Sequence, residues 1–247
     1  MIKGILCDIG GVLYSGDKVI DGAVEAVDEL KKRFKIRFLS NTSRKPPFLL
    51  YQKLKNLGFH IEEKEIFTAL KALKKYLKDK KISAYAVATD EAKEYLKLPF
   101  ELKAVAICDA YKNFTYDNLN QAFRYLEEGF EFLATNKNRY FKEGNSLSLD
   151  AGAFVVGLEY ASKKEAKILG KPSCEFFYEA VDDMKLTPSE VVMIGDDIES
   201  DILGAKKCGI KTILVKSGKF KKSDLSVTKP DFIVDSIKDA VTICNTL

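Results

Sequence analysis

Acidic side chains gather late in the chain, in the segment GDDIESD that spans residues 195–201. The segment holds Asp196, Asp197, Glu199 and Asp201. Crowded carboxylates repel one another unless a cation lies among them, and a small set of oxygen ligands with room for water and a phosphate suits Mg²⁺. The segment therefore predicts a magnesium site. The sequence leaves open the alternative that these acids cap a helix starting near Ile198, because negative side chains oppose the positive end of a helix.

A further carboxylate belongs to Asp8, which follows the apolar run 2–7 and precedes the pair Gly10 and Gly11. This pattern predicts a buried parallel strand that breaks into a loop. A carboxylate at a strand end projects from rigid backbone, so Asp8 is a candidate nucleophile or metal ligand. The plainer alternative is that Asp8 caps the following turn.

Two other polar groups are placed where they could bind a phosphoryl group. Ser40, followed by Asn41 and Thr42, ends a second apolar run and offers a hydroxyl and backbone N–H groups. Lys171, in the segment GKPS, offers a cation just before a helix that Pro172 is suited to start. The alternatives are that Ser40 is a helix cap and that Lys171 is an ordinary surface lysine.

The elements around these residues predict an α/β fold with a doubly wound parallel sheet. Short apolar runs predict strands at residues 2–7, 36–39, 191–194, 211–215 and 232–234. Helical spacing is found at residues 24–30, 46–57 and 202–208. Because parallel crossovers bring the carboxyl ends of the strands to one edge of the sheet, we expect Asp8, Ser40 and Asp196 to converge there.

The middle of the chain has its own set of elements and can bury its own core. Strands are predicted at 85–88, 104–108 and 132–134, and helices at 119–126 and 155–160. We therefore expect a core domain formed by residues 1–69 and 168–247, and an inserted α/β domain at 70–167 with hinges near Thr68 and Lys167.

Composition excludes several classes of function. The 247 residues carry 40 Lys+Arg against 36 Asp+Glu, a net charge of +4 that is spread along the chain, so nucleic acid is a poor candidate partner. No apolar run approaches the roughly 20 residues that span a bilayer, and no secretory signal pattern is present. The 5 cysteines are scattered and odd in number, which predicts neither a disulfide framework nor a structural zinc and favours a reducing cytoplasm. The single histidine, His60, is expected in a surface loop.

The order Asp8, Ser40, Lys171, Asp196 resembles the haloacid dehalogenase (HAD) superfamily of phosphotransferases, which has a Rossmann-like core. The segments YKNFTYDNLNQAF (111–123), ATNKNRY (134–140), GLEYA (157–161) and GKPSCEFF (170–177) resemble its capped, nitrophenylphosphatase-type subgroup. Within that subgroup, DIGGVLY (8–14), MIGDD (193–197) and KSGKF (216–220) resemble the branch that acts on phospholysine, phosphohistidine and pyrophosphate. The resemblance covers essentially the whole chain.

The resemblance implies a role for each matching residue. Asp8 would attack phosphorus and become an aspartyl phosphate, and Ser40 and Lys171 would hold the phosphoryl oxygens. The resemblance also implies substrate-binding residues, namely Gly10, Gly11, Ser40, Asn41, Thr42 and Lys171. The implied Mg²⁺ ligands are Asp8, the main-chain oxygen of Gly10 and Asp196, with Asp201 and Asp197 acting through water or by orienting Lys171. A small phosphorylated substrate is the expected partner, neither nucleic acid nor a membrane is expected, and the resemblance allows a homodimer paired through the inserted cap domain.

One position departs from the family pattern. The family usually has a second Asp two residues after the nucleophile, as general acid and base, but position 10 is glycine. Proton transfer of this kind is typically worth ~10²- to 10⁴-fold. We therefore expect a phosphatase that favours activated leaving groups, such as P–N bonds, pyrophosphate, aryl or acyl phosphates. Two alternatives stay open: a catalytically weak or inactive HAD protein that binds a phosphorylated ligand or a protein partner, and a phosphotransferase with an acceptor other than water.

Overall fold

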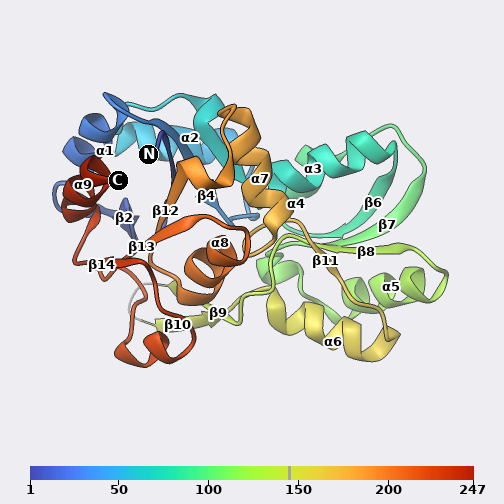
Figure 1. Ribbon diagram of the computed structural model, residues 1–247. Helices are drawn as coiled ribbons and strands as arrows, with labels where there is room; N and C mark the ends of the chain where they lie inside the picture. Colours follow the sequence, from blue (N-terminus) through green and yellow to red (C-terminus); the bar gives the residue numbers. More distant parts are fainter. Residues whose placement is uncertain (144–145) are drawn as a thin grey trace. The chain divides into compact units, whose positions relative to one another are not determined.

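The computed structural model describes residues 1–143 and 146–247, and these form two compact units (Figure 1). The first unit comprises Met1–Ser40, Leu50–Phe67 and Lys171–Leu247, and the second comprises Asn41–Leu49 and Thr68–Gly170. This division places residues 41–49, 68–69 and 168–170 with the second unit, whereas the sequence predicted boundaries at 69/70 and 167/168. The role of the second unit as a cap stays a prediction.

A six-stranded sheet forms the centre of the first unit, in the order β14-β13-β12-β1-β4-β5. Its strands are β1 (Gly4–Asp8), β4 (Lys35–Ser40), β5 (Ile66–Thr68), β12 (Val191–Gly195), β13 (Lys211–Val215) and β14 (Phe232–Val234). β1 pairs in parallel with both β4 and β12, and β13 pairs in parallel with β12 and β14. Every residue of β1 and β12 is buried, as expected for central strands with both faces covered.

Helices cover both faces of this sheet. α1 (Ala23–Lys31), α2 (Pro47–Asn56) and α9 (Ile237–Thr246) supply Val27, Leu54 and Ala240 to a core that also contains Ile5 and Cys7 of β1. α7 (Cys174–Asp183) packs against β1, and the short helices η4 (Ile198–Leu203) and α8 (Gly204–Lys207) follow β12 and contact β13. The smaller elements are the antiparallel pair β2 (Tyr14–Ser15) and β3 (Lys18–Val19) and the single turns η1 (Glu63–Glu65), η3 (Pro188–Glu190) and η5 (Lys222–Ser226).

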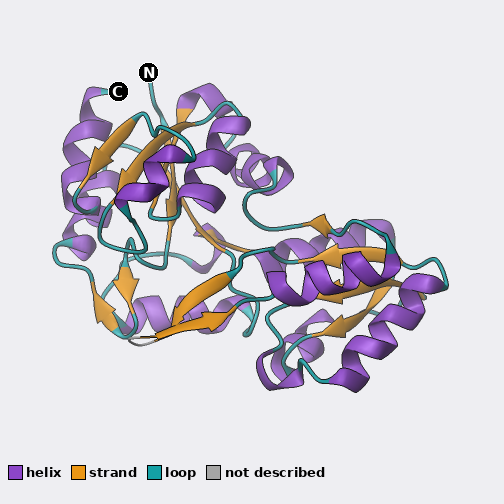
Figure 2. Ribbon diagram, turned by 90° about the horizontal axis from the view of Figure 1, so that it is seen from below, coloured by secondary structure: helices purple, strands orange, loops and turns teal. Residues whose placement is uncertain are grey.

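The second unit has its own parallel sheet, in the order β11-β8-β7-β6 (Figure 2). Its strands are β6 (Ser83–Val87), β7 (Leu102–Ile107), β8 (Glu131–Ala134) and β11 (Lys167–Ile168). α3 (Ala69–Lys80) and α4 (Asp90–Leu96) share one hydrophobic core with this sheet, and α5 (Tyr116–Glu127) and α6 (Gly152–Ser162) share the other. The turn η2 (Tyr111–Asn113) and the antiparallel strands β9 (Tyr140–Glu143) and β10 (Ser146–Leu149) complete the unit.

The predicted fold class is confirmed, since each predicted strand and helix has a counterpart within a few residues. The helix predicted at 202–208 differs in detail. It begins at Ile198 with a wide turn, in which the Ile202 N–H donates to the Asp197 carbonyl five residues earlier, and it becomes α-helical only at Gly204. The two short antiparallel pairs were not predicted, because strands of two to four residues carry little alternating pattern.

The expectation that the cysteines form no disulfide is wrong for one pair. Cys174, at the start of α7, is bonded to Cys208, directly after α8, with the Cα atoms 5.4 Å apart. Cys7, Cys108 and Cys244 are free and buried. The sequence gave no signal for this pair because its members are 34 residues apart and meet only when α7 and α8 pack together. The predicted reducing cytoplasm stays a prediction.

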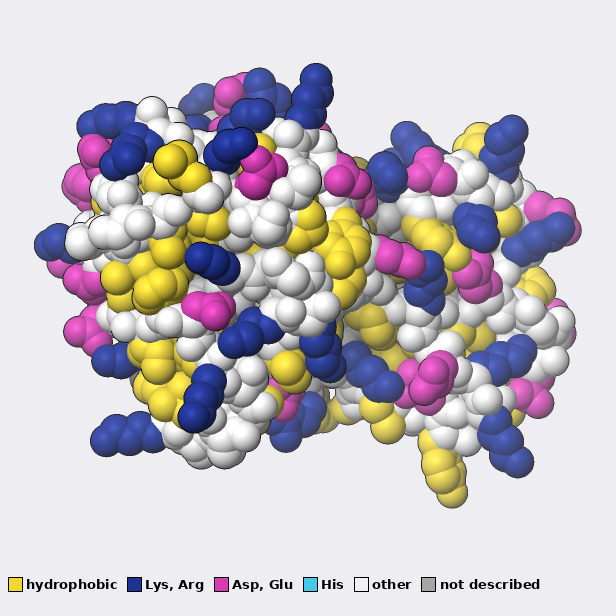
Figure 3. Space-filling model, viewed as in Figure 1, with side chains coloured by type: hydrophobic (Ala, Val, Ile, Leu, Met, Phe, Trp, Pro, Cys, Tyr) yellow, Lys and Arg dark blue, Asp and Glu magenta, His cyan; other side chains and the backbone are white. Residues whose placement is uncertain are grey.

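The surface agrees with the mild net charge. On the face drawn in Figure 3, Lys and Arg side chains are interspersed with Asp and Glu side chains. His60 lies in a surface loop, as predicted, with its side chain 78% exposed and 3.0 Å from Asp28. Among the described residues, no helix is both long and apolar enough to cross a membrane.

Candidate active site

Three carboxylates meet at the carboxyl edge of the first unit's sheet. Asp8 ends β1, Asp196 follows β12, and Asp201 lies in η4. Because Cys7 pairs with Ile194 across the two central strands, Asp8 and Asp196 occupy adjacent strand ends. Each of the three side chains offers a carboxylate oxygen, and these oxygens lie within 4.8 Å of one another. The convergence that the sequence predicted for Asp8 and Asp196 is therefore found in the structure.

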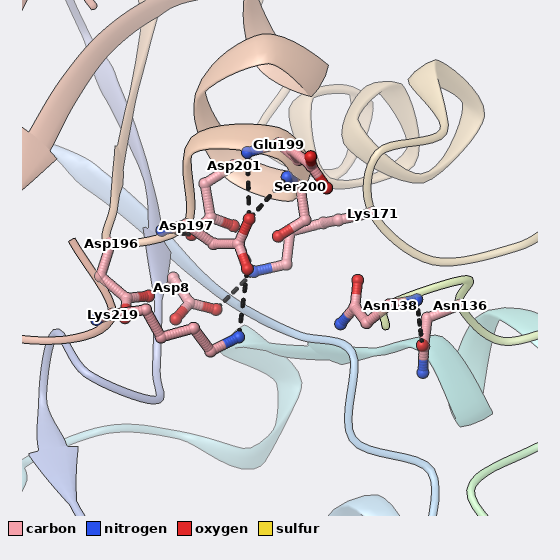
Figure 4. A network of polar contacts seen from close by, with 10 residues as sticks. All are labelled: Asp8, Asn136, Asn138, Lys171, Asp196, Asp197, Glu199, Ser200, Asp201 and Lys219. Carbon is pink, nitrogen blue, oxygen red and sulfur yellow. Dashed lines mark hydrogen bonds and ion pairs between the residues drawn. The ribbon is translucent and has the colours of Figure 1, made fainter. Parts of the chain in front are cut away.

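Lys171 joins two of these carboxylates (Figure 4). Its Nζ donates to Asp8 Oδ1, and to Asp201 Oδ1 at 2.6 Å. The lysine side chain is 3% exposed, which excludes the surface-lysine alternative. Burial lowers the pKa of Lys171, but the carboxylates of Asp201 and Asp8 more than offset that effect, so its pKa is raised overall. The site thus holds a buried ammonium group against Asp8.

The carboxylates are crowded even with Lys171 bound to two of them. Burial, followed by the charges of Asp8 and Asp201, raises the pKa of Asp196 well above its usual range. Burial raises the pKa of Asp201 to about 7, although Lys171 opposes the shift. Buried oxygen donors that repel one another in this way fit a small, hard divalent cation such as Mg²⁺.

The backbone fixes Asp201 in place. Its Oδ2 accepts the Asp197 N–H at 3.1 Å, and its side chain packs on Gly195, where an added Cβ would lie 2.4 Å from the Asp201 Cβ. Any other residue at position 195 would therefore collide with the group that holds Lys171. Wide helical turns of the kind that carries Asp201 are often found at functional sites.

Asp197 serves a different purpose from its neighbours. Its Oδ1 accepts the N–H groups of Glu199 and Ser200, both at 3.0 Å, and its Oδ2 pairs with Lys219 Nζ at 3.1 Å. The helix-cap alternative therefore describes Asp197, whereas Asp196 and Asp201 belong to the carboxylate group. Asp197 is not among the three oxygen donors that lie within 4.8 Å of one another, and its expected part at the metal site, through water or by orienting Lys171, stays a prediction.

The predicted phosphate-binding residues are only partly brought together. Ser40 follows Leu39, the residue that pairs with Asp8, so it lies at the strand end beside the carboxylate. Gly11 has a φ of +79° and packs on Asp196, where a Cβ would lie 2.3 Å from Oδ2. Gly10 is exposed. Asn41 and Thr42 belong to the second unit, and their part in phosphate binding stays a prediction.

Two residues at the site, Ser217 and Lys219, were not assigned a role from the sequence. The Lys219 N–H donates to Asp196 Oδ2 at 2.8 Å, and the neighbouring Ser217 Oγ donates to the Gly11 carbonyl at 2.7 Å. Both residues lie in a loop after β13, at the same edge of the sheet as Asp8. The signal that could have found them is a polar, glycine-containing segment directly after an apolar strand.

The arrangement of sheet, carboxylates and lysine matches what the sequence resemblance implied for a HAD-type α/β enzyme. A haloacid dehalogenase-like hydrolase family model matches residues 5–98, and a HAD-hydrolase-like model matches residues 168–240. Phospholysine phosphohistidine inorganic pyrophosphate phosphatase from Homo sapiens is 38% identical, over 98% of this chain and 94% of its own. Haloacid dehalogenase-like hydrolase domain-containing protein 2 from Mus musculus is 39% identical, over 93% of this chain and 90% of its own. The solved p-nitrophenyl phosphatase from Archaeoglobus fulgidus superposes with a TM-score of 0.90 at 26% identity and covers 98% of this chain and 99% of its own.

The chain therefore belongs to the haloacid dehalogenase-like hydrolases. Two of the proteins named above are phosphatases, which confirms the prediction of a HAD-type phosphatase and the resemblance to the capped, nitrophenylphosphatase-type subgroup.

Proposed function

We propose that this protein is a Mg²⁺-dependent phosphatase of small phosphorylated compounds in which Asp8 is the nucleophile. The observation that supports this most directly is the position of Asp8, whose carboxylate is bound to the buried cation of Lys171 and lies beside Asp196 and Asp201. A group that served only to cap a turn would not need a buried lysine and two more buried carboxylates around it.

The proposed reaction has two displacements. A carboxylate oxygen of Asp8 attacks phosphorus while the bond from phosphorus to the leaving group breaks, which yields an aspartyl phosphate. Water then attacks the phosphorus, which releases inorganic phosphate and restores Asp8. Lys171 stays charged throughout because Asp201 holds it, and it offsets the negative charge of the phosphoryl oxygens. Ser40, at the neighbouring strand end, is placed to hold another of those oxygens.

Three side chains and one main-chain group would hold the metal. These are Asp8, Asp196 and Asp201, together with the carbonyl of Gly10. When bound, Mg²⁺ supplies positive charge that neutralises the developing charge on the phosphoryl group. The carboxylates' contribution is to present fixed oxygen donors in a buried place.

Position 10 decides which substrates such a site would favour. Glycine cannot donate a proton to a leaving group, so the proposed preference is for leaving groups that depart without one: P–N bonds, pyrophosphate, and aryl or acyl phosphates. The names of two relatives, one a phospholysine, phosphohistidine and pyrophosphate phosphatase and one a p-nitrophenyl phosphatase, support substrates of this kind.

The second unit supplies candidate selecting loops, at residues 136–140 and 150–153. The Asn138 N–H donates to Asn136 Oδ1 at 3.0 Å (Figure 4), and the Gly152 N–H donates to the Asn138 carbonyl at 3.0 Å. The two loops therefore hold each other in one conformation. We propose that this pair contributes to substrate choice, and that copies of the chain pair through the same unit.

A substrate panel with Mg²⁺ tests the proposal. We expect faster hydrolysis of p-nitrophenyl phosphate, pyrophosphate and a phosphohistidine mimic than of glucose 6-phosphate, with all activity lost in Asp8→Asn and in EDTA. Rapid-quench labelling should find phosphate on Asp8. Binding of phosphate compounds without hydrolysis would favour the inactive-protein alternative instead, and phosphoryl transfer to added alcohols would reveal a phosphotransferase.

A further inference from the structure

The loop between β13 and η5 approaches the Asp196 carboxylate unusually closely. The Lys219 N–H donates to Oδ2 at 2.8 Å. A Cβ added at Gly218 would lie 1.9 Å from the same oxygen, and one added at Gly11 would lie 2.3 Å from it. Oδ2 is therefore enclosed by two stretches of backbone and held by a hydrogen bond, which leaves Oδ1 as the oxygen that Asp196 can offer to a ligand.

The glycine at position 218 is explained by this close approach alone. Gly11 has a φ of +79°, so its backbone conformation already favours glycine, whereas the φ of Gly218 lies outside the left-handed region. An alanine at 218 would be free of backbone strain. What it would meet is the Asp196 carboxylate, with Oδ2 at 1.9 Å and Cγ at 2.5 Å from the new Cβ.

Ser217 ties the two enclosing stretches together. Its Oγ donates to the Gly11 carbonyl at 2.7 Å, so the loop after β1 and the loop after β13 are joined directly beside Asp196. A carboxylate that is already fixed loses little side-chain freedom when it binds a cation, and groups that orient a metal ligand typically change metal affinity by about 10- to 100-fold.

We propose that Ser217, Gly218 and the backbone N–H of Lys219 form a positioning segment that fixes Asp196 as a metal ligand. This inference rests on the proposed Mg²⁺ site. It assigns to the segment a role in cation affinity and none in contacting the phosphoryl group. The side chain of Lys219 is not part of the positioning segment, because the hydrogen bond to Asp196 comes from the main chain of Lys219.

Metal binding by the full-length protein, stripped with EDTA, tests the inference. Titration with Mg²⁺ by calorimetry, and with Mn²⁺ by electron paramagnetic resonance, gives the affinity independently of turnover. We expect Gly218→Ala to bind at least tenfold more weakly than wild type. Lys219→Met, which keeps the N–H but removes a cation from beside the carboxylates, should bind no more weakly than wild type. The control Gly157→Ala, where no atom lies within 4 Å of the added Cβ, should stay within threefold.

Turnover supplies a readout that general damage to the fold would not reproduce. In Gly218→Ala, high Mg²⁺ should restore kcat on p-nitrophenyl phosphate to within threefold of wild type, with KM for that substrate unchanged, whereas Asp196→Asn should not recover. If Gly218→Ala fails to fold, Ser217→Ala should weaken Mg²⁺ binding three- to tenfold and Ser217→Thr should restore it.

Several outcomes would overturn the inference. They are wild-type affinity in the folded Gly218→Ala protein, a loss of kcat that Mg²⁺ does not restore, and a tenfold weakening in Lys219→Met, which would assign the effect to the ammonium group. If wild type itself neither binds Mg²⁺ nor hydrolyses p-nitrophenyl phosphate, the proposed function has failed instead, so the two failures are distinguishable.

Discussion

Placing an aspartate at position 10 would test the proposed leaving-group preference, because the variant should gain activity on substrates whose leaving group needs a proton. No atom lies within 4 Å of a Cβ built at Gly10, and the φ of Gly10 lies outside the left-handed region. The Cβ of an aspartate therefore meets no steric clash at this position, and the backbone is not in the region that favours glycine. Because position 10 is also exposed, we expect Gly10→Asp to change the free energy of unfolding by about 0.5 kcal/mol or less.

The expected gain follows from what general acid–base catalysis contributes. A positioned acid is typically worth ~10²- to 10⁴-fold, and the lower end corresponds to a barrier lower by about 2.7 kcal/mol. We expect kcat/KM of Gly10→Asp for glucose 6-phosphate to rise about 100-fold over wild type. The leaving group of p-nitrophenyl phosphate departs without a proton, so its release depends little on an acid. The rise in kcat/KM for this substrate should therefore stay within about threefold.

The assay is steady-state release of phosphate at saturating Mg²⁺ from pH 5 to 9, with Gly10→Asn as the matched control. Asparagine has nearly the size of aspartate but cannot transfer the proton, so Gly10→Asn should gain nothing, and only Gly10→Asp should lose activity at high pH. Equal gains in the two variants, or equal gains on the two substrates, would refute the reasoning.

Three other predictions concern the buried charges and the disulfide. Lys171→Met leaves Asp8 and Asp201 without their buried cation. We therefore expect the free energy of unfolding at pH 8 to fall by about 3–5 kcal/mol, measured by urea denaturation of the metal-free protein. Turnover should be undetectable. Replacing Cys174 and Cys208 by alanine removes a disulfide between residues 34 apart in the sequence. Loop-closure entropy then predicts a fall of about 3–4 kcal/mol in the free energy of unfolding. A urea midpoint unchanged from wild type would count against this. Burial raises the pKa of Asp201 to about 7, above its value in the unfolded chain. The free energy of unfolding of the metal-free protein therefore falls as the pH rises from the unfolded pKa of this group toward 7. Calorimetry should therefore find a larger rise in Tm on adding Mg²⁺ at pH 8 than at pH 5, and an equal rise at both would contradict the assigned donors.

The residues that could be predicted from the sequence are those whose position follows from the ends of strands. Asp8 and Asp196 were predicted to converge because each follows a largely apolar run, and parallel strands bring their carboxyl ends to one edge. Lys171 was a candidate because it is a cation just before a helix that Pro172 is suited to start, but only the family resemblance placed it at one site with Asp8. Its burial depends on its two ion pairs, which the order of residues does not reveal.

The contacts that could not be predicted join segments that meet only after the chain has folded. Lys219 is 23 residues from Asp196, and Ser217 is 206 residues from Gly11. A hydrogen bond between such groups depends on how two loops leave neighbouring strands, and no local pattern of residue types records that. The disulfide is a contact of the same kind, because it required α7 and α8 to pack together.

The glycines around the site carry information that side-chain motifs do not. Gly195 leaves room for Asp201, while Gly11 and Gly218 leave room for Asp196, each at a distance no Cβ could accept. Backbone is thus packed directly against two of the three carboxylates, so their positions are set before any cation binds. Burial, and then the charges of Asp8 and Asp201, raise the pKa of Asp196, so it is unfavourable for all three carboxylates to be ionised together without a further cation beside them. Under the proposed function, a divalent cation held at these oxygens would offset that repulsion and let a dianionic phosphate approach Asp8.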